Sequence, residues 1–260
     1  MGKVRNKSRF NNLSAKSLFI LLTLLITVLA MLTSYQPIWA NIPINIILPI
    51  IVLLKLDTVF FEKLKLSTLL LMRVLIVFAV LGFVPGDLYV KIVLAFLCIN
   101  ILEATLTDLR KKKYCNVITG IALVVTVFLM KGTWLDYYYI ATSDGILGMV
   151  FWIIAYTIWN WIFVTNEFSP AIALYHVGVL SAPLLGIIFK QDPGLWLIFR
   201  GNSLTIAGII QIANKEYLEE KFMNRGFTNF VETISKKNVQ IILMIINLIL
   251  LAAMVKISIF

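Results

Sequence analysis

The feature that most constrains this chain is a succession of apolar stretches separated by short, mostly basic segments. A helix that crosses a bilayer needs about 20 predominantly apolar residues. Nine stretches are candidates, of which the second and fifth are short: residues 17–35, 43–55, 67–84, 88–107, 115–130, 146–165, 171–189, 194–213 and 239–257. Because 60% of the 260 residues are apolar and only 14% are charged, too little polar surface remains to face water on all sides. The sequence predicts an all-α, multi-pass membrane protein with about nine transmembrane helices.

The 23 Lys and Arg residues indicate which ends of these spans face the cytoplasm. With the N-terminus inside, the inner segments hold 17 of them and the outer segments and span ends hold 4, while Arg73 and Arg200 lie within spans. Basic residues concentrate on the cytoplasmic side of membrane proteins. We therefore expect a cytoplasmic N-terminus in the bacterial cytoplasmic membrane, with anionic lipid headgroups as the partner of the basic face. Basic clusters between spans argue against a nucleic-acid partner, and the oligomeric state is not indicated.

The whole chain, residues 1–260, is expected to form a single transmembrane domain. Its basic start, residues 1–16, precedes an apolar run too long for the ~7–15-residue core of a signal peptide, so we expect it to be retained. Residues 214–238 carry apolar side chains at helical steps among charged ones, which predicts an interfacial amphipathic helix broken near Gly226; a solvated linker is the alternative. Residues 131–145 hold four Trp and Tyr residues, and we expect this loop to anchor in the outer headgroup layer.

Polar side chains within the apolar stretches are the candidates for a functional site, because an ionisable group at membrane depth costs about 2.5–3.5 kcal/mol on insertion scales. Asn100 and Glu103 share one helical face of the span 88–107. Ser203 and Gln211 belong to a polar stripe that begins at Arg200. The predicted substrate-binding residues are Arg73, Asn100, Glu103, Tyr156, Asn160, His176, Ser203 and Gln211.

Four of these side chains are expected at a common depth. Arg73, Glu103, Asn160 and His176 lie about 6–9 Å inside the cytoplasmic boundary when each residue rises about 1.5 Å. This predicts a polar cavity in the inner leaflet, in which Arg73 neutralises Glu103 and over which the connection 166–170, the one inner segment without a basic residue, closes. Other interpretations stay open: hydrogen bonds worth about 0.6 kcal/mol that only tie helices together, arginines that snorkel to the interface, and a structural histidine.

Several catalytic arrangements are excluded by the residues present. The single histidine rules out a zinc site built from three imidazoles. The sequence contains no G-x-S-x-G, Walker loop, Rossmann fingerprint or Cys-x-x-Cys. We expect no metal and no cofactor, and no catalytic residue is identified.

Three short motifs carry a resemblance to a known family. They are Tyr156–Phe163 (YTIWNWIF), the preceding Asn100–Glu103 and the following Tyr175-His176. Over spans four to eight the chain resembles a bacterial family of polytopic membrane proteins of unknown function. The resemblance implies no established reaction, but it implies that Glu103, Asn160 and His176 belong to one site.

The leading functional hypothesis is a transporter-like protein that binds a small polar solute in the inner-leaflet cavity, because the polar stripe from Arg200 continues toward the outer face. The first alternative is a membrane-embedded enzyme acting on a lipid-linked substrate, with Glu103 and His176 as acid and base. The second is a non-catalytic assembly subunit whose polar stripes bind another helix. The sequence does not decide whether the protein is an enzyme, but it favours a protein without catalytic activity.

Overall fold

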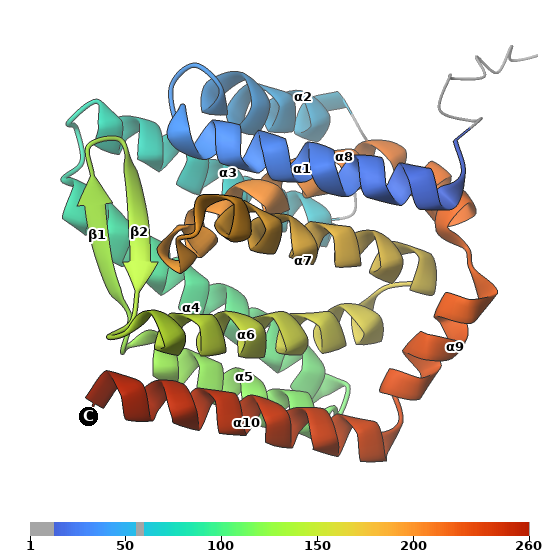
Figure 1. The fold of residues 1–260 in the computed structure, drawn as a ribbon. Coiled ribbons are helices and arrows are strands. Elements are labelled where there is room, and N and C mark those ends of the chain that lie inside the picture. The colour runs from blue at the N-terminus through green and yellow to red at the C-terminus, as the bar shows by residue number, and fades with distance from the viewer. Residues whose placement is uncertain (1–12, 56–59, 260) are drawn as a thin grey trace, which may run out of the picture.

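The computed structural model describes residues 13–55 and 60–259, so most of the basic segment 1–16 lies outside the described residues. The described part consists of helices and one hairpin (Figure 1). The elements are α1 (Ala15–Tyr35), the π-helix η2 (Ile42–Ile47), α2 (Leu48–Lys55), α3 (Phe60–Val80), α4 (Gly86–Arg110), α5 (Tyr114–Val127), β1 (Lys131–Leu135), β2 (Tyr138–Thr142), α6 (Ile146–Glu167), α7 (Pro170–Lys190), the 3₁₀ turn η3 (Pro193–Leu195), α8 (Trp196–Phe222), α9 (Arg225–Ile234) and α10 (Lys237–Ile259).

Six helices of the described part are long and apolar enough to cross a membrane: α1, α4, α6, α7, α8 with the turn before it, and α10. Three shorter apolar helices cover Ile42–Leu54, Leu66–Val80 and Tyr114–Val127. The outward faces of the long helices suit lipid, since α10 exposes Ile242, Ile245 and Ile249. The predicted class, a multi-pass helical membrane protein, is confirmed.

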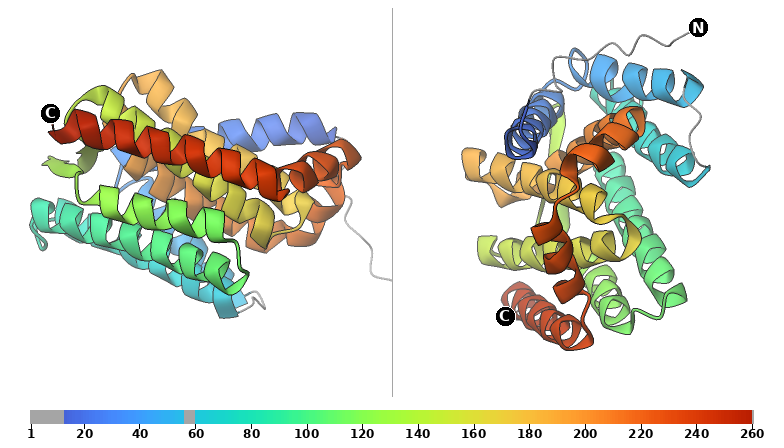
Figure 2. Two further views of the ribbon diagram at one scale, coloured as in Figure 1. Left: turned by 90° about the horizontal axis from the view of Figure 1, so that it is seen from below. Right: turned by 90° about the vertical axis from the view of Figure 1, so that its right-hand side faces the viewer.

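The helices lie side by side, and from α1 to α8 consecutive helices along the chain run across the molecule in opposite directions (Figure 1). Viewed end-on, α1, α7, α6 and α10 form one row, and α3, α4 and α5 form a second (Figure 2). Helix α8 packs against α1 and α7 on one side and α3 on the other, and α10 joins the two rows through α5 and α6. The chain thus brings α3 and α4 opposite α6, α7 and α8.

Two apolar clusters hold this arrangement together. The larger one surrounds Trp152, Trp159 and Trp196, which are fully buried between α4, α5, α6 and α8. The smaller one joins α1, α7 and α8 through Ile26 and Val179. Large aromatic side chains contribute most to such cores because each buries about 150–250 Å².

Helix α7 illustrates how the sequence sets the helix ends. Its N-cap, Ser169, accepts a hydrogen bond from the backbone N–H of Ile172 at 3.4 Å, and Pro170 occupies the first helical position, where no N–H is needed. The helix continues through Pro183 to Lys190 without a break.

Residues 214–238 depart from the predicted single break near Gly226. Helix α8 kinks at Asn214 and ends at Phe222, and the second break lies at the extended residues Met223 and Asn224, before α9. Helix α9 turns Val231 and Ile234 inward and lies across one end of the bundle (Figure 2). The apolar periodicity identified the helix, but not the two places where it bends.

The segment 131–145, expected to be a membrane anchor, contains an antiparallel hairpin with Leu135 opposite Tyr138. Its two-residue turn includes Asp136 with a positive φ of 46°, as tight hairpins favour. Trp134 packs over Gly86, where a side chain would collide with the indole. Tyr139 points inward and is fully buried. The hairpin adds a small β element to the predicted all-α fold.

Candidate functional site

A cavity of about 170 Å³ lies between α3 and α4 on one side and α6, α7 and α8 on the other. Its polar wall includes six of the eight predicted site residues together with Arg200 and Tyr139: Arg73, Asn100, Tyr139, Tyr156, Asn160, His176, Arg200 and Gln211. These side chains come from five helices and the hairpin, so only the tertiary fold brings them together. The remaining wall is largely apolar, with Leu97, Phe163 and Leu204 among its members.

Arg73 belongs to a buried polar network at one end of this cavity. Its Nη1 donates a hydrogen bond to Oδ1 of Asn202, which also accepts from Nδ2 of Asn45 at 3.3 Å. Nδ2 of Asn202 donates to Oγ of Ser34 at 2.6 Å. The backbone carbonyl of Arg73 accepts from Nδ2 of Asn41 at 3.2 Å. The network links α1, η2, α3 and α8 through Asn202 and Arg73.

Arg200 reaches the cavity from the first turns of α8. Only 5% of Arg200 is exposed, so it does not snorkel to the interface in the way the sequence allowed. Its Nη2 donates to Oδ1 of Asn160 at 3.4 Å, which links α8 to α6. Strand β2 and η3 pack over this end of α8 and keep the side chain inside.

His176 and Gln211 lie at the other end of the cavity wall. The Nε2 atom of His176 is 2.8 Å from Oε1 of Gln211, and the imidazole stacks on the ring of Phe168 with centroids 5.1 Å apart. Phe168 belongs to the connection 166–170 and lines the cavity, in the position expected for that segment. His176 and Gln211 therefore form a hydrogen-bonded pair covered by an aromatic ring.

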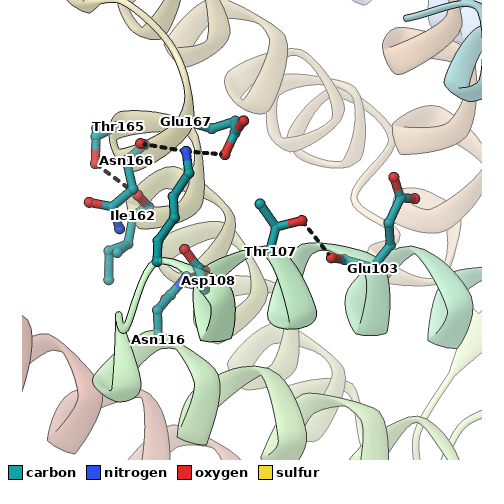
Figure 3. A network of polar contacts seen from close by, with 9 residues as sticks. Glu103, Thr107, Asp108, Asn116, Ile162, Thr165, Asn166 and Glu167 are labelled. Atoms are coloured by element: carbon teal, nitrogen blue, oxygen red, sulfur yellow. Dashed lines mark hydrogen bonds and ion pairs between the residues drawn. The ribbon is translucent and has the colours of Figure 1, made fainter. Parts of the chain in front are cut away.

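Two predicted site residues do not line the cavity. Ser203 is fully buried in helix packing, and its hydroxyl donates to the carbonyl of Arg200 at 3.0 Å. Glu103 is half-buried and projects from α4 away from the cluster of Asp108 and Glu167 (Figure 3). Within the described residues no ion pair joins Arg73 to Glu103. The predicted neutralisation of Arg73 by Glu103 is thus replaced by the hydrogen bond to Asn202.

The polar groups also differ in depth. Arg200 precedes Gln211 by eleven residues on α8, which places them about 16 Å apart along the helix axis. The cavity-facing positions of α8 include Arg200, Leu204, Gly208 and Gln211, whereas Ser203 and Ala207 do not line the cavity. The face of α8 that lines the cavity therefore differs by about one residue from the predicted polar stripe, which ran through Ser203 and Ala207. Apolar residues surround α8 on several sides, so the sequence pattern alone did not indicate which side faces α3.

A separate polar cluster joins the ends of α4, α5 and α6 (Figure 3). Asp108 is buried and accepts a hydrogen bond from Nδ2 of Asn116 at 2.6 Å. Lys111 pairs with Glu167 at 2.7 Å, partly exposed to solvent. This cluster fixes the helix ends and contributes no side chain to the cavity.

Tyr139 supplies a neutral hydroxyl group to the cavity wall. Burial raises the pKa of this phenol far above its usual range, and the nearby Arg73 opposes the shift only in part. Its position could not be read from the sequence, because an aromatic residue in a loop between spans is typical of the headgroup layer. Asn41, Asn45 and Asn202 carried a weaker signal: each is an amide within or beside an apolar stretch.

Comparison of the chain with protein-family models, with curated proteins and with solved structures finds no match.

Proposed function

We propose that this chain is a transporter-like membrane protein that binds a small polar solute in the cavity between α3, α4, α6, α7 and α8. The observation that carries the proposal is the gathering of buried polar side chains from separate helices around one cavity. Polar groups in a membrane interior that face a shared cavity are typical of solute pathways. The mixed wall, polar at Arg73, Asn160 and His176 and apolar elsewhere, is typical of small-molecule sites.

Irregular helices beside the cavity support the same function. The chain forms a π-helix at Ile42–Ile47 before α2, and α8 is non-helical at Asn214. Transporters often build their sites from interrupted helices, and π-turns recur at functional sites. Asn45 in the π-helix is completely buried and belongs to the Arg73 network.

The enzyme alternative needs an acid and a base near the same substrate. Of the pair considered for this role, His176 lines the cavity and Glu103 does not. The described cavity wall contains no Asp or Glu side chain that takes the place of Glu103. Solute binding therefore accounts for the wall better than acid–base catalysis does.

The proposed topology has nine crossings, a cytoplasmic N-terminus and a location in the bacterial cytoplasmic membrane. The turn at Lys112 and the kinked segment after Asn214 lie at one end of the bundle, and the hairpin lies at the other (Figure 1). The first end carries Arg110 to Lys113, and the second carries few basic residues. This asymmetry supports the positive-inside assignment.

The solute cavity is tested by cysteine labelling along α8. In a background with Cys98 and Cys115 replaced by Ala, we expect a small polar thiol reagent to modify Leu204→Cys and Gly208→Cys. Ser203→Cys and Ala207→Cys are the matched controls and should stay protected, because both side chains are buried away from the cavity. Added Cβ atoms at position 208 find room, with Leu66 Cδ1 at 3.9 Å. Equal protection at all four positions would mean that the wall is packed and takes no solute.

A further inference from the structure

Two guanidinium groups in the cavity are buried without a carboxylate partner among the described residues. Arg73 is 3% exposed and Arg200 is 5% exposed. All of their described side-chain acceptors are neutral groups: the Asn202 amide and the Tyr139 hydroxyl for Arg73, and the Asn160 amide for Arg200. The part of the cavity wall that the structure describes includes no Asp or Glu.

The hydrogen-bonding capacity of both groups is only partly used. A guanidinium has five N–H donors in a planar fork. Nε of Arg73, and Nε and Nη1 of Arg200, are buried and have no acceptor in the described part of the chain. A buried donor without an acceptor is unfavourable, and a buried charge without a counter-charge is more so. The free donors therefore indicate an acceptor that is not part of the described wall.

Both arginines line the cavity, and Arg73 contacts the part of α8 that carries Arg200. Arg73 approaches the backbone so closely that a side chain at Gly201 would lie 2.9 Å from its Nη2 atom. Gly201 follows Arg200 directly, so the Arg73 guanidinium contacts α8 at the position next to Arg200. Like charges brought together in a medium of low dielectric repel each other, and an anion between them converts this repulsion into attraction.

Resting on the solute-binding function proposed above, we infer that the cavity binds a small organic anion whose carboxylate or phosphate group lies at Arg73 and Arg200. Planar arginine forks match both groups in a bidentate way. The cavity volume of about 170 Å³ is below the range of about 300–1,000 Å³ typical of drug-sized ligands, so the anion is small. Its uncharged part packs against Leu69, Leu97, Phe163 and Leu197, which favours a short hydrocarbon body.

The test measures ligand-induced thermal stabilisation of the full chain in nanodiscs of neutral lipid. The probes are hexanoate, hexyl phosphate and uncharged hexanamide. We expect one or both anions, but not the amide, to stabilise the protein in a saturable way. Arg73→Gln and Arg200→Gln should each weaken the apparent affinity about tenfold or more, whereas Arg225→Gln, exposed on α9, should leave it unchanged. If Arg73→Gln does not fold, Arg200→Gln decides, since its loss removes a single described side-chain bond.

The outcomes separate this inference from the solute-binding function. Hexanamide binding as tightly as the anions, or anion binding that survives both arginine substitutions, would overturn the anion assignment while the labelled cavity stands. Failure of cysteine labelling along α8 would instead remove the cavity itself. Competition by phosphatidylglycerol added to the nanodiscs would support an anionic lipid headgroup as the source of the anion, and lack of competition would support a free solute.

Discussion

Asn202 is the residue on which the polar end of the cavity depends. It is 1% exposed, accepts from Arg73 and Asn45, and donates to Ser34, so one amide connects α8 with α1, η2 and α3. An amide suits this position because it is both donor and acceptor. A carboxylate in its place would neutralise Arg73 directly and would leave Ser34 to act as the donor.

Replacing Asn202 with Ala should lower the unfolding free energy by about 2 kcal/mol, because Arg73 loses its amide acceptor and Ser34 loses a donor. Asn238→Ala, at an exposed position of α10, is the control and should change stability by less than about 0.5 kcal/mol. Thermal or denaturant unfolding in detergent measures both. A loss at position 202 no larger than that of the control would show that the network contributes little to stability.

Helices α4 and α5 pack closely against each other at Gly120. The two helices are joined by a short turn in which Lys112 has a positive φ of 58°. Gly120 on α5 faces α4, and a Cβ there would collide with the hydroxyl of Thr105 and lie 3.0 Å from Nε1 of Trp159. Small residues at helix crossings allow such close packing in membranes. The sequence identified α5 as a short, uncertain span, and this contact explains why it packs well despite its length.

Gly120→Ala is expected to destabilise the protein by about 1–3 kcal/mol, the usual cost of overpacking. Gly208→Ala is the matched substitution, because its Cβ has ordinary contact distance to Leu66 and Ala favours the helix by about 1 kcal/mol. The two variants should therefore shift the melting temperature in opposite directions, measured by thermal unfolding in detergent. A neutral Gly120→Ala would show that α4 and α5 separate easily.

The membrane topology can be tested by labelling residues in two exposed turns. Lys112 and Asp136 are exposed, lie in turns at opposite ends of the bundle and have positive φ angles. In whole cells carrying a variant without native cysteines, Asp136→Cys should react with a membrane-impermeant thiol reagent. Lys112→Cys should react only after the membrane is permeabilised. Reaction of both positions in intact cells would place the two turns on one side and remove α5 from the set of crossings.

At this scale the sequence predicted the class and most of the polar side chains that line the cavity, for a definite physical reason. Apolar runs report burial in lipid regardless of partners, so every predicted stretch is largely helical within the described residues, although helices end before residue 81 of the third stretch and residue 128 of the fifth. Six of the eight predicted polar residues line one cavity, because a polar group in such a run is costly unless it faces others. The failures have a common cause. Tyr139, Glu103 and Ser203 were misplaced because helix rotation and the fold of a loop depend on long-range packing, which composition and periodicity do not contain.

The bond between Arg73 and Asn202 has a consequence for how the protein is made. The two residues are 129 positions apart in the chain. At about 5–20 residues per second, a ribosome needs roughly 6–26 seconds to reach Asn202 after it has added Arg73. During that interval a guanidinium on a nascent segment has no access to its final amide partner. During membrane insertion the Arg73 charge therefore has to be stabilised by other groups until α8 has been synthesised. The polar network around Arg73 is complete only when α8 packs against α3.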